Sequence, residues 1–207
     1  MKSLLLSIAL ATAVLSTAQL HADTTLAEPW IDNAYVNNHG PVKNILVIGV
    51  PDHPDERHQL EQTFSKALSD SGVSAMPSLD IMSADVEVNK GNVLAAIAGR
   101  DFDAVLLTQV YRVDDVDIVP GGDPDRVTDR DFAIQLWDNY EGARDQALDA
   151  RKKKEHRLVL ENNLYDLKSE DLVWSVQSYS INPKSSDKII RELSRLIPAS
   201  LKKASLI

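Results

Sequence analysis

A short segment around residue 52 could carry chemistry, because it brings carboxylates and imidazoles together between a predicted strand and a predicted helix. The candidate metal ligands or acid–base groups are Asp52, His53 and His58, and strand-to-helix turns of α/β folds often bind ligands. The two histidines are five positions apart, whereas two ligands on one helical face are three or four apart. The competing interpretation is a solvated helix start, with carboxylates near the positive end of the helix dipole.

The sequence lacks elements that other reactive arrangements require. Acidic residues gather between 114 and 125, but the spacing of a calcium-binding loop is absent. A nucleophile elbow of the form G-x-S-x-G is also absent. Gly49 is the only glycine in the turn at 49–57, so this turn does not have the pattern of a phosphate-binding loop. We therefore expect no cofactor, and the sequence favours a protein that is not an enzyme.

Composition restricts the class of protein. The chain has 207 residues, a formal net charge of −9 and no cysteine. An acidic surface disfavours nucleic acid as a partner, because like charges repel. Without cysteine the chain has no disulfide, no thiol nucleophile and no thiolate metal site. The length is sufficient for one domain with a hydrophobic core.

The N-terminus has the pattern of a secretory signal peptide. Lys2 precedes the apolar run LLLSIALATAVL, and small residues follow this run. We expect cleavage after Ala18, with Ala22 as the alternative site. The run is too short to span a bilayer comfortably, and no cysteine is present for lipid attachment. The sequence therefore predicts a signal peptide at 1–18 and a periplasmic protein with no transmembrane segment after cleavage.

The remaining chain is predicted to form an α/β domain at 44–207, preceded by an irregular lead-in at 19–43 that shows no clear period. Hydrophobic periodicity predicts strands at 44–50, 73–77 and 103–113, and helices at 54–71 and 91–98. It also predicts a hairpin at 156–181 and a final helix that begins at about 185. Pro198 should kink or end the last helix. The order β-α-β-α-β, an insertion, β-β and α predicts a single mixed sheet of about five strands with packed helices.

The hairpin has the clearest pattern, because its apolar residues recur with a period of two. In its first strand one face is predicted to carry Leu158, Leu160 and Leu164, and the other Arg157, Val159, Glu161, Asn163 and Tyr165. In its second strand one face is predicted to carry Leu172, Trp174 and Val176, and the other Val173, Ser175, Gln177 and Tyr179. The second face of the hairpin is mixed. A second packed layer, a half-wet sheet face and a partner surface all remain open interpretations.

The insertion at 114–155 contains one stripe with helical spacing. Its members are Phe132, Leu136, Trp137 and Tyr140. Apolar helical stripes usually face their own fold, whereas Trp and Tyr also concentrate binding energy at interfaces. The stripe is therefore predicted to be either ordinary core or a site for a partner or for self-association.

Four sequence blocks occur in a recognisable order. They are NILVIGVP at 44–51, then Arg57, Glu61, Leu68 and Gly72, then FDAVLL at 102–107, and finally NLYDL and DLVWS within 163–175. In this order they resemble small bacterial envelope proteins, many of them lipoproteins, whose α/β domain is like the N-terminal domain of TolB. The resemblance implies an accessory or assembly role in the cell envelope and supplies no catalytic residues. This chain departs from it by lacking the lipid-attachment cysteine.

These observations lead to three hypotheses about function. The first is a non-enzymatic periplasmic envelope protein that acts through protein–protein contacts, with an envelope protein or a second copy as partner. The second is a periplasmic protein that binds a small ligand or a metal through the turn at 52–58. The third is an uncharacterised hydrolase.

Overall fold

The computed structural model describes residues 24–50, 54–114, 157–181 and 183–207. In chain order, the elements of this part are β1 (Thr24–Leu26), β2 (Trp30–Ile31), α1 (Asn33–Asn38), β3 (Asn44–Val50), α2 (Pro54–Asp70), β4 (Ser74–Pro77), the 3-10 turn η1 (Ser78–Asp80), α3 (Lys90–Ile97), β5 (Ala104–Asp114), β6 (Arg157–Asp166), β7 (Leu172–Ile181) and α6 (Ser186–Lys203).

The strands form one mixed sheet, which confirms the predicted fold class. The strand order is β1-β7-β6-β5-β3-β4, and β2 also pairs with β7. Strands β4, β3 and β5 are parallel, whereas β5, β6 and β7 are antiparallel neighbours. The five strands expected from the sequence are all present, and β1 and β2 bring the described sheet to seven.

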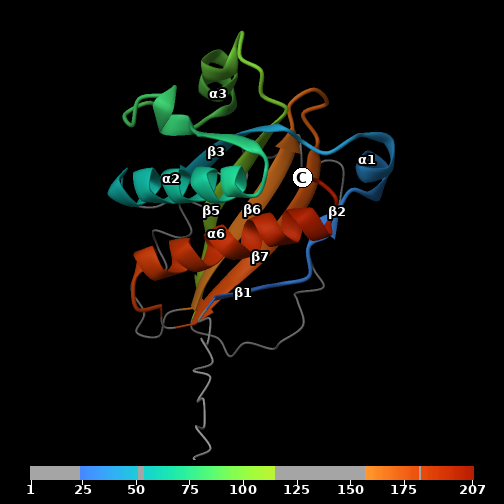
Figure 1. Cartoon of the computed structure of the whole chain (residues 1–207). Helices are drawn as coiled ribbons and strands as arrows, with labels where there is room; N and C mark the ends of the chain where they lie inside the picture. The colour runs from blue at the N-terminus through green and yellow to red at the C-terminus, as the bar shows by residue number, and fades with distance from the viewer. Residues whose placement is uncertain (1–23, 51–53, 115–156, 182) are drawn as a thin grey trace, which may run out of the picture.

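Helices α2 and α6 cover one face of the sheet (Figure 1), here called the first face. The buried side chains between them include Phe64 and Leu68 from α2, Leu193 and Ile197 from α6, and Trp174 from β7. Both helices present these side chains at intervals of four, as expected for an amphipathic helix with one face toward a core. Burial of this apolar surface is the main force that holds the helices on the sheet.

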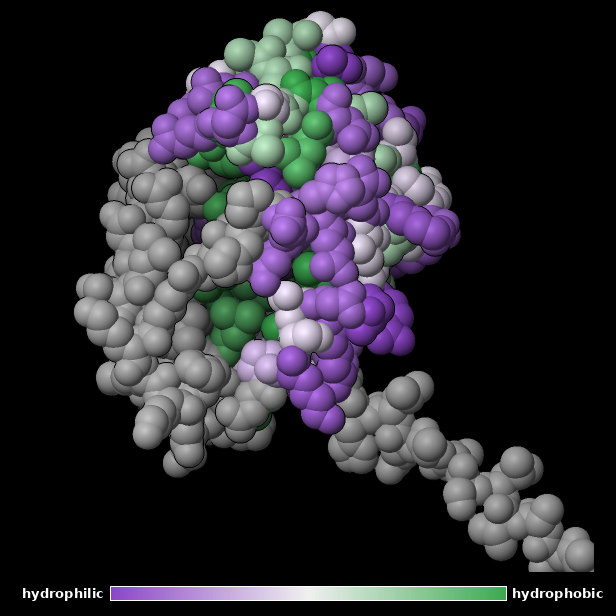
Figure 2. Space-filling model, turned by 90° about the vertical axis from the view of Figure 1, so that its left-hand side faces the viewer, coloured by the Kyte–Doolittle hydropathy of each residue, from purple (hydrophilic) through white to green (hydrophobic). Residues whose placement is uncertain are grey.

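The opposite face of the sheet, here called the second face, has a smaller apolar core. Leu46 and Ile48 of β3 and Leu107 of β5 pack there against Val93 of α3. Figure 2 shows that the described surface on one side is largely hydrophilic, with hydrophobic residues near the upper end. Two of the more exposed large apolar side chains, Val86 and Leu94, belong to α3 and the loop before it.

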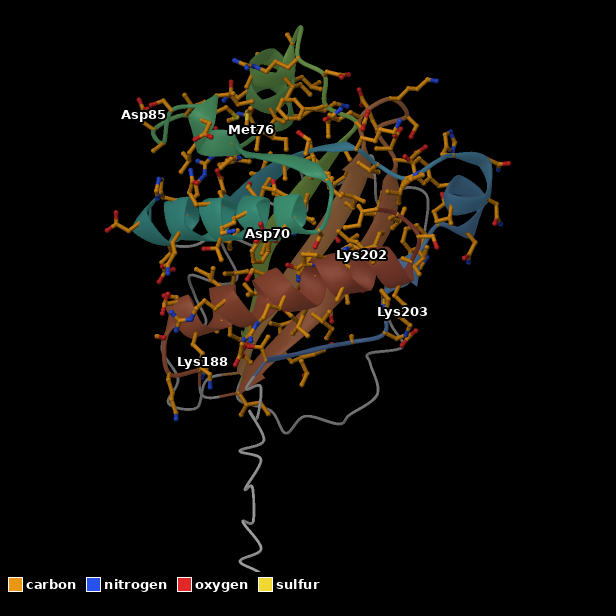
Figure 3. The ribbon with its side chains drawn as sticks, in the orientation of Figure 1. Asp70, Met76, Asp85, Lys188, Lys202 and Lys203 are labelled. Carbon is orange, nitrogen blue, oxygen red and sulfur yellow. The ribbon has the colours of Figure 1, made fainter. Side chains whose placement is uncertain are left out.

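The start of α6 agrees with the sequence prediction, and the helix does not end at Pro198. Ser185 caps its start by accepting a hydrogen bond from the Lys188 backbone N–H. Lys202 and Lys203 lie in its last turn (Figure 3), where cations complement the helix dipole. Pro198 was expected to kink the helix or to end its first half; the helix continues to Lys203 with Pro198 buried inside it, so it does not end there.

The hairpin confirms the predicted faces, with one correction. Trp174 is fully buried in the first-face core with Leu164 and Val176. Leu172 was predicted to join them, but it packs on the second face, and Val173 joins the first-face core instead. The pairing shifts between Leu164 and Tyr165, so one extra residue is accommodated in β7. Such a bulge reverses the alternation of side chains on its far side.

The segment before residue 44 is more regular than its sequence pattern indicates. Strands β1 and β2 pair antiparallel with β7, and Asp32 caps the short helix α1. Thr24 is buried and its hydroxyl lies 2.9 Å from that of Ser180. The described sheet therefore extends beyond the predicted domain boundary at residue 44. None of the helices in the described part combines the length and apolar composition of a membrane span.

Candidate functional site

The structure describes only one of the site residues singled out from the sequence. His58 is an exposed residue of α2, while Asp52 and His53 lie outside the described residues. The stripe of Phe132, Leu136, Trp137 and Tyr140 also lies outside them. Within the described ranges, no group of three His, Cys, Asp or Glu side chains could hold a metal ion.

A buried ion pair lies at the carboxyl end of β3, close to His58 in the sequence. Glu61 is fully buried, and its Oε1 accepts hydrogen bonds from Gly49 N at 3.0 Å and Arg57 Nε at 2.9 Å. The same oxygen accepts the Ser78 hydroxyl at 2.6 Å, and Oε2 accepts Leu79 N at 2.9 Å. Arg57 also donates to the Ser78 hydroxyl. These hydrogen bonds join β3, α2 and η1, so the Glu61 carboxylate has a structural role.

An open groove of about 510 Å³ lies near the start of β3, at the opposite end of that strand. Its lining comes from α1 and the segment after it, from the start of β5 and from the turn after β6, and consists of Tyr35, His39, Gly40, Pro41, Val42, Lys43, Phe102, Asp103, Asp166, Leu167 and Lys168. We call it the α1 groove. Val42 is buried in it, Phe102 and Leu167 are partly buried, and Lys43 and Lys168 are exposed.

The acidic groups of the α1 groove are held by hydrogen bonds within the chain. The Tyr35 hydroxyl donates to Asp166 Oδ1 at 3.1 Å, and Asp166 Oδ2 accepts the Ser169 backbone N–H at 2.7 Å. Asp103 Oδ2 accepts the backbone N–H groups of Lys43 and Asn44. Burial raises the pKa of Tyr35 to about 12, and the nearby Asp166 and Asp103 carboxylates add to this shift. The phenol therefore stays neutral at physiological pH.

Two adjacent asparagines of β6 have opposite hydrogen-bonding states. Asn162 and Asn163 are both 0% exposed, on opposite faces of the sheet. Asn162 Oδ1 accepts the Thr108 hydroxyl at 3.0 Å, and its Nδ2 donates to the Val176 carbonyl at 3.3 Å. Neither polar atom of the Asn163 side chain has a hydrogen-bond partner. The chain itself therefore satisfies the polar atoms of Asn162 but not those of Asn163.

Two further unpaired side chains lie on the second face near Asn163. Gln109 Nε2 donates to Glu161 Oε2 at 3.2 Å, but its buried Oε1 has no partner. The buried hydroxyl of Tyr165 is also unpaired. We call Gln109, Asn163 and Tyr165 the unpaired polar cluster. The other unpaired atoms among the described residues are single ones, on Ser65, Trp174 and Glu192.

Burial raises the pKa of the Tyr165 phenol well above its usual value, and the negative charge of Glu161 adds to this effect. The Asn163 amide lies close enough to oppose the shift, but the two side chains do not meet in hydrogen-bond geometry. Tyr165 is therefore a neutral hydroxyl that can donate one hydrogen bond. Alternation along β6 already placed Asn163 and Tyr165 on one face, whereas the contribution of Gln109 depends on strand register.

Comparison with known proteins adds little to this geometry. No family model and no curated protein matches the chain. Two crystal structures of the PelC dodecamer from Paraburkholderia phytofirmans, one of them a point variant, are distant matches to the chain. They share 13% and 14% sequence identity with TM-scores of 0.42 and 0.44, and each match covers 86% of this chain and 96% of PelC. Similarity at this level supports no statement about family or function.

Proposed function

We propose that this chain is an exported, non-enzymatic protein of the cell envelope that acts by contact with another protein. The observation that carries the proposal is the α1 groove, where Tyr35, Asp103 and Asp166 are each held by hydrogen bonds within the chain. Groups fixed in this way are suited to shaping a binding surface rather than to transferring protons. The N-terminal pattern of Lys2 followed by an apolar run supports export.

The chemistry of the groove suggests which partner segment fits it. Val42, Phe102 and Leu167 supply apolar surface, while Lys43 and Lys168 supply exposed positive charge. The carboxylate oxygens of Asp103 and Asp166 already accept hydrogen bonds from within the chain, so part of their capacity to accept hydrogen bonds from a partner is used. A partner segment with an apolar side chain beside an acidic residue would complement these features.

Site-specific photo-crosslinking in intact cells tests this proposal. A photoreactive amino acid replaces Lys43 or Lys168 at the groove, and Lys66 on α2 serves as the control, because it is exposed and does not line the groove. We expect one adduct of defined mass from both groove positions and none from position 66. Absence of an adduct, or the same adduct from all three positions, would contradict the proposal. An adduct of twice the chain mass would make the partner a second copy.

The alternative function is binding of a small ligand or a metal at the turn 52–58, which the sequence suggests through Asp52, His53 and His58. Of these three residues the structure describes only His58, which is exposed on α2. Equilibrium dialysis with zinc and calcium, with His58→Ala as the variant, would test it.

A further inference from the structure

Three segments of the chain that are far apart in sequence meet at Asp103 in the α1 groove. Asp103 Oδ2 accepts the backbone N–H of Lys43 at 2.8 Å, and the Asp103 carbonyl accepts the backbone N–H of Leu167 at 2.8 Å. Strand β5 lies between β3 and β6 in the sheet, so Lys43 and Lys168 stand on opposite sides of Asp103. Strands β3 and β6 are two strand spacings apart, about 10 Å. The flexible side chains of the two lysines can therefore reach one anion between them.

The positive charges at the groove are not used within the described part of the chain. Lys43 and Lys168 are both exposed, and neither has an ion-pair partner among the described residues. The exposed Lys66 and Lys90, by contrast, are each paired with a carboxylate of the chain. The chain as a whole has a formal net charge of −9, so the groove is a local exception that attracts an anionic group.

The groove adds apolar surface and a hydrogen-bond acceptor to these charges. Val42, Phe102 and Leu167 line it. Asp103 receives two backbone N–H groups on Oδ2, so its Oδ1 has lone pairs that can accept an N–H group from a ligand. The volume of about 510 Å³ is in the range of small-ligand sites. The groove is therefore suited to the end of a chain more than to a long segment.

We infer that the α1 groove binds the C-terminal end of a partner chain whose last side chain is apolar, an inference that rests on the proposed function. The terminal carboxylate lies between Lys43 and Lys168. The last side chain packs against Phe102 and Leu167, and a backbone N–H donates to Asp103. In an extended segment neighbouring side chains point to opposite sides. A terminal carboxylate therefore brings negative charge closer to an apolar side chain than an adjacent acidic side chain does.

Peptide titration of the full purified chain tests the inference by NMR, with the backbone amide resonances of Lys43 and Leu167 as the readout. The probe is acetyl-Ala-Gly-Leu with a free carboxylate, and the matched control is the same peptide with a C-terminal amide. We expect saturable shifts with the free acid. Binding of the amide should be weaker by about tenfold or more, because the hydrogen bonds to a charged carboxylate are lost.

Variants of the two lysines locate the carboxylate. Lys43→Gln and Lys168→Gln should each weaken binding of the free acid by about threefold, as expected for the loss of one exposed charge pair. Both variants should leave binding of the amide unchanged. Lys66→Gln, which alters an exposed lysine that does not line the groove, is the control variant and should leave both affinities unchanged. Full affinity for the free acid in both groove variants would overturn the inference.

Hexanoate, which has a carboxylate and an apolar chain but no N–H group, separates a chain end from a simple carboxylic acid. Binding of hexanoate as tight as that of the free-acid peptide would show that the groove does not recognise a peptide, and the inference would be wrong. Equal affinity for the free acid and the amide, or no saturable shift with either, would also overturn it. A crosslinked adduct at the groove together with equal binding of the two peptides would leave the proposed partner contact standing and exclude recognition of a chain end.

Discussion

Glu61 is the side chain on which the local structure depends most at the carboxyl end of β3. It is fully buried and accepts hydrogen bonds from Gly49, Arg57, Ser78 and Leu79. Glu61→Ala removes these bonds and leaves Arg57 as a buried charge without its carboxylate. We expect a loss of about 3–5 kcal/mol in unfolding free energy, measured by urea denaturation. Asp70→Ala, which breaks the exposed pair with Lys66, is the control and should cost less than about 1 kcal/mol.

Tyr35 gives a prediction about pH dependence. Its pKa is about 12 in the folded protein against an ordinary value of 10.0, so above pH 10 the folded state holds a proton that the unfolded chain releases. Stability from this residue is therefore present below pH 10 and is lost as pH rises toward 12. Tyr165 has a raised pKa as well and contributes in the same direction.

Comparison of variants isolates the Tyr35 contribution. We expect Tyr35→Phe to lose less stability than the wild type between about pH 10 and about pH 12, because phenylalanine has no proton to release. Urea denaturation over this range measures the difference, with both proteins in the Tyr165→Phe background to remove the second contribution. Parallel stability curves for the two proteins would show that the Tyr35 pKa is not raised by folding.

At the scale of elements, the β6–β7 hairpin is the central unit of the sheet. Trp174 is fully buried between the strands and the helices of the first face. Trp174→Ala should lower the unfolding free energy by about 3–5 kcal/mol, as truncation of a buried aromatic does. With Trp30 and Trp137 replaced by Phe, the fluorescence of Trp174 should be blue-shifted and poorly quenched by acrylamide. A red-shifted, readily quenched emission would place this side chain in solvent.

Periodicity predicted the long elements because each repeats its pattern several times. Strands β3 and β5 and helices α2 and α6 are all close to their predicted ranges. Strands β1 and β2 were missed, since three and two residues are too few to show a period. The exchange of Leu172 and Val173 between faces also escaped prediction, because a bulge depends on pairing with the neighbouring strand.

The candidate sites could be predicted only in part for a related reason. The alternation along β6 placed Glu161, Asn163 and Tyr165 on one face. That Asn162 would be paired and Asn163 unpaired depends on which residues of β5 and β7 lie opposite them. The α1 groove brings Tyr35 to Asp166 across 131 positions of sequence, and no local pattern reports such a contact.

At the scale of the whole molecule, export is the property that the N-terminal sequence predicts most specifically. We expect the mature chain to begin after Ala18, or after Ala22, and to be recovered from the periplasm of a Gram-negative host. Mass spectrometry of the N-terminus after cell fractionation measures this. A chain that begins at Met1 and remains in the membrane pellet would contradict export with signal cleavage.

The molecule combines a well-packed first face with a second face that retains unpaired polar side chains, and Asn163 is the residue that tests this description most directly. We propose measuring the unfolding free energies of Asn163→Leu and Asn162→Leu against the wild type in the absence of any ligand. Asn163→Leu should be at least as stable as the wild type, because it removes two unpaired buried atoms, while Asn162→Leu should lose about 1–3 kcal/mol, because it leaves Thr108 and Val176 without their partner. Equal losses in the two variants would show that Asn163 is paired within the folded chain and would contradict this description of the second face.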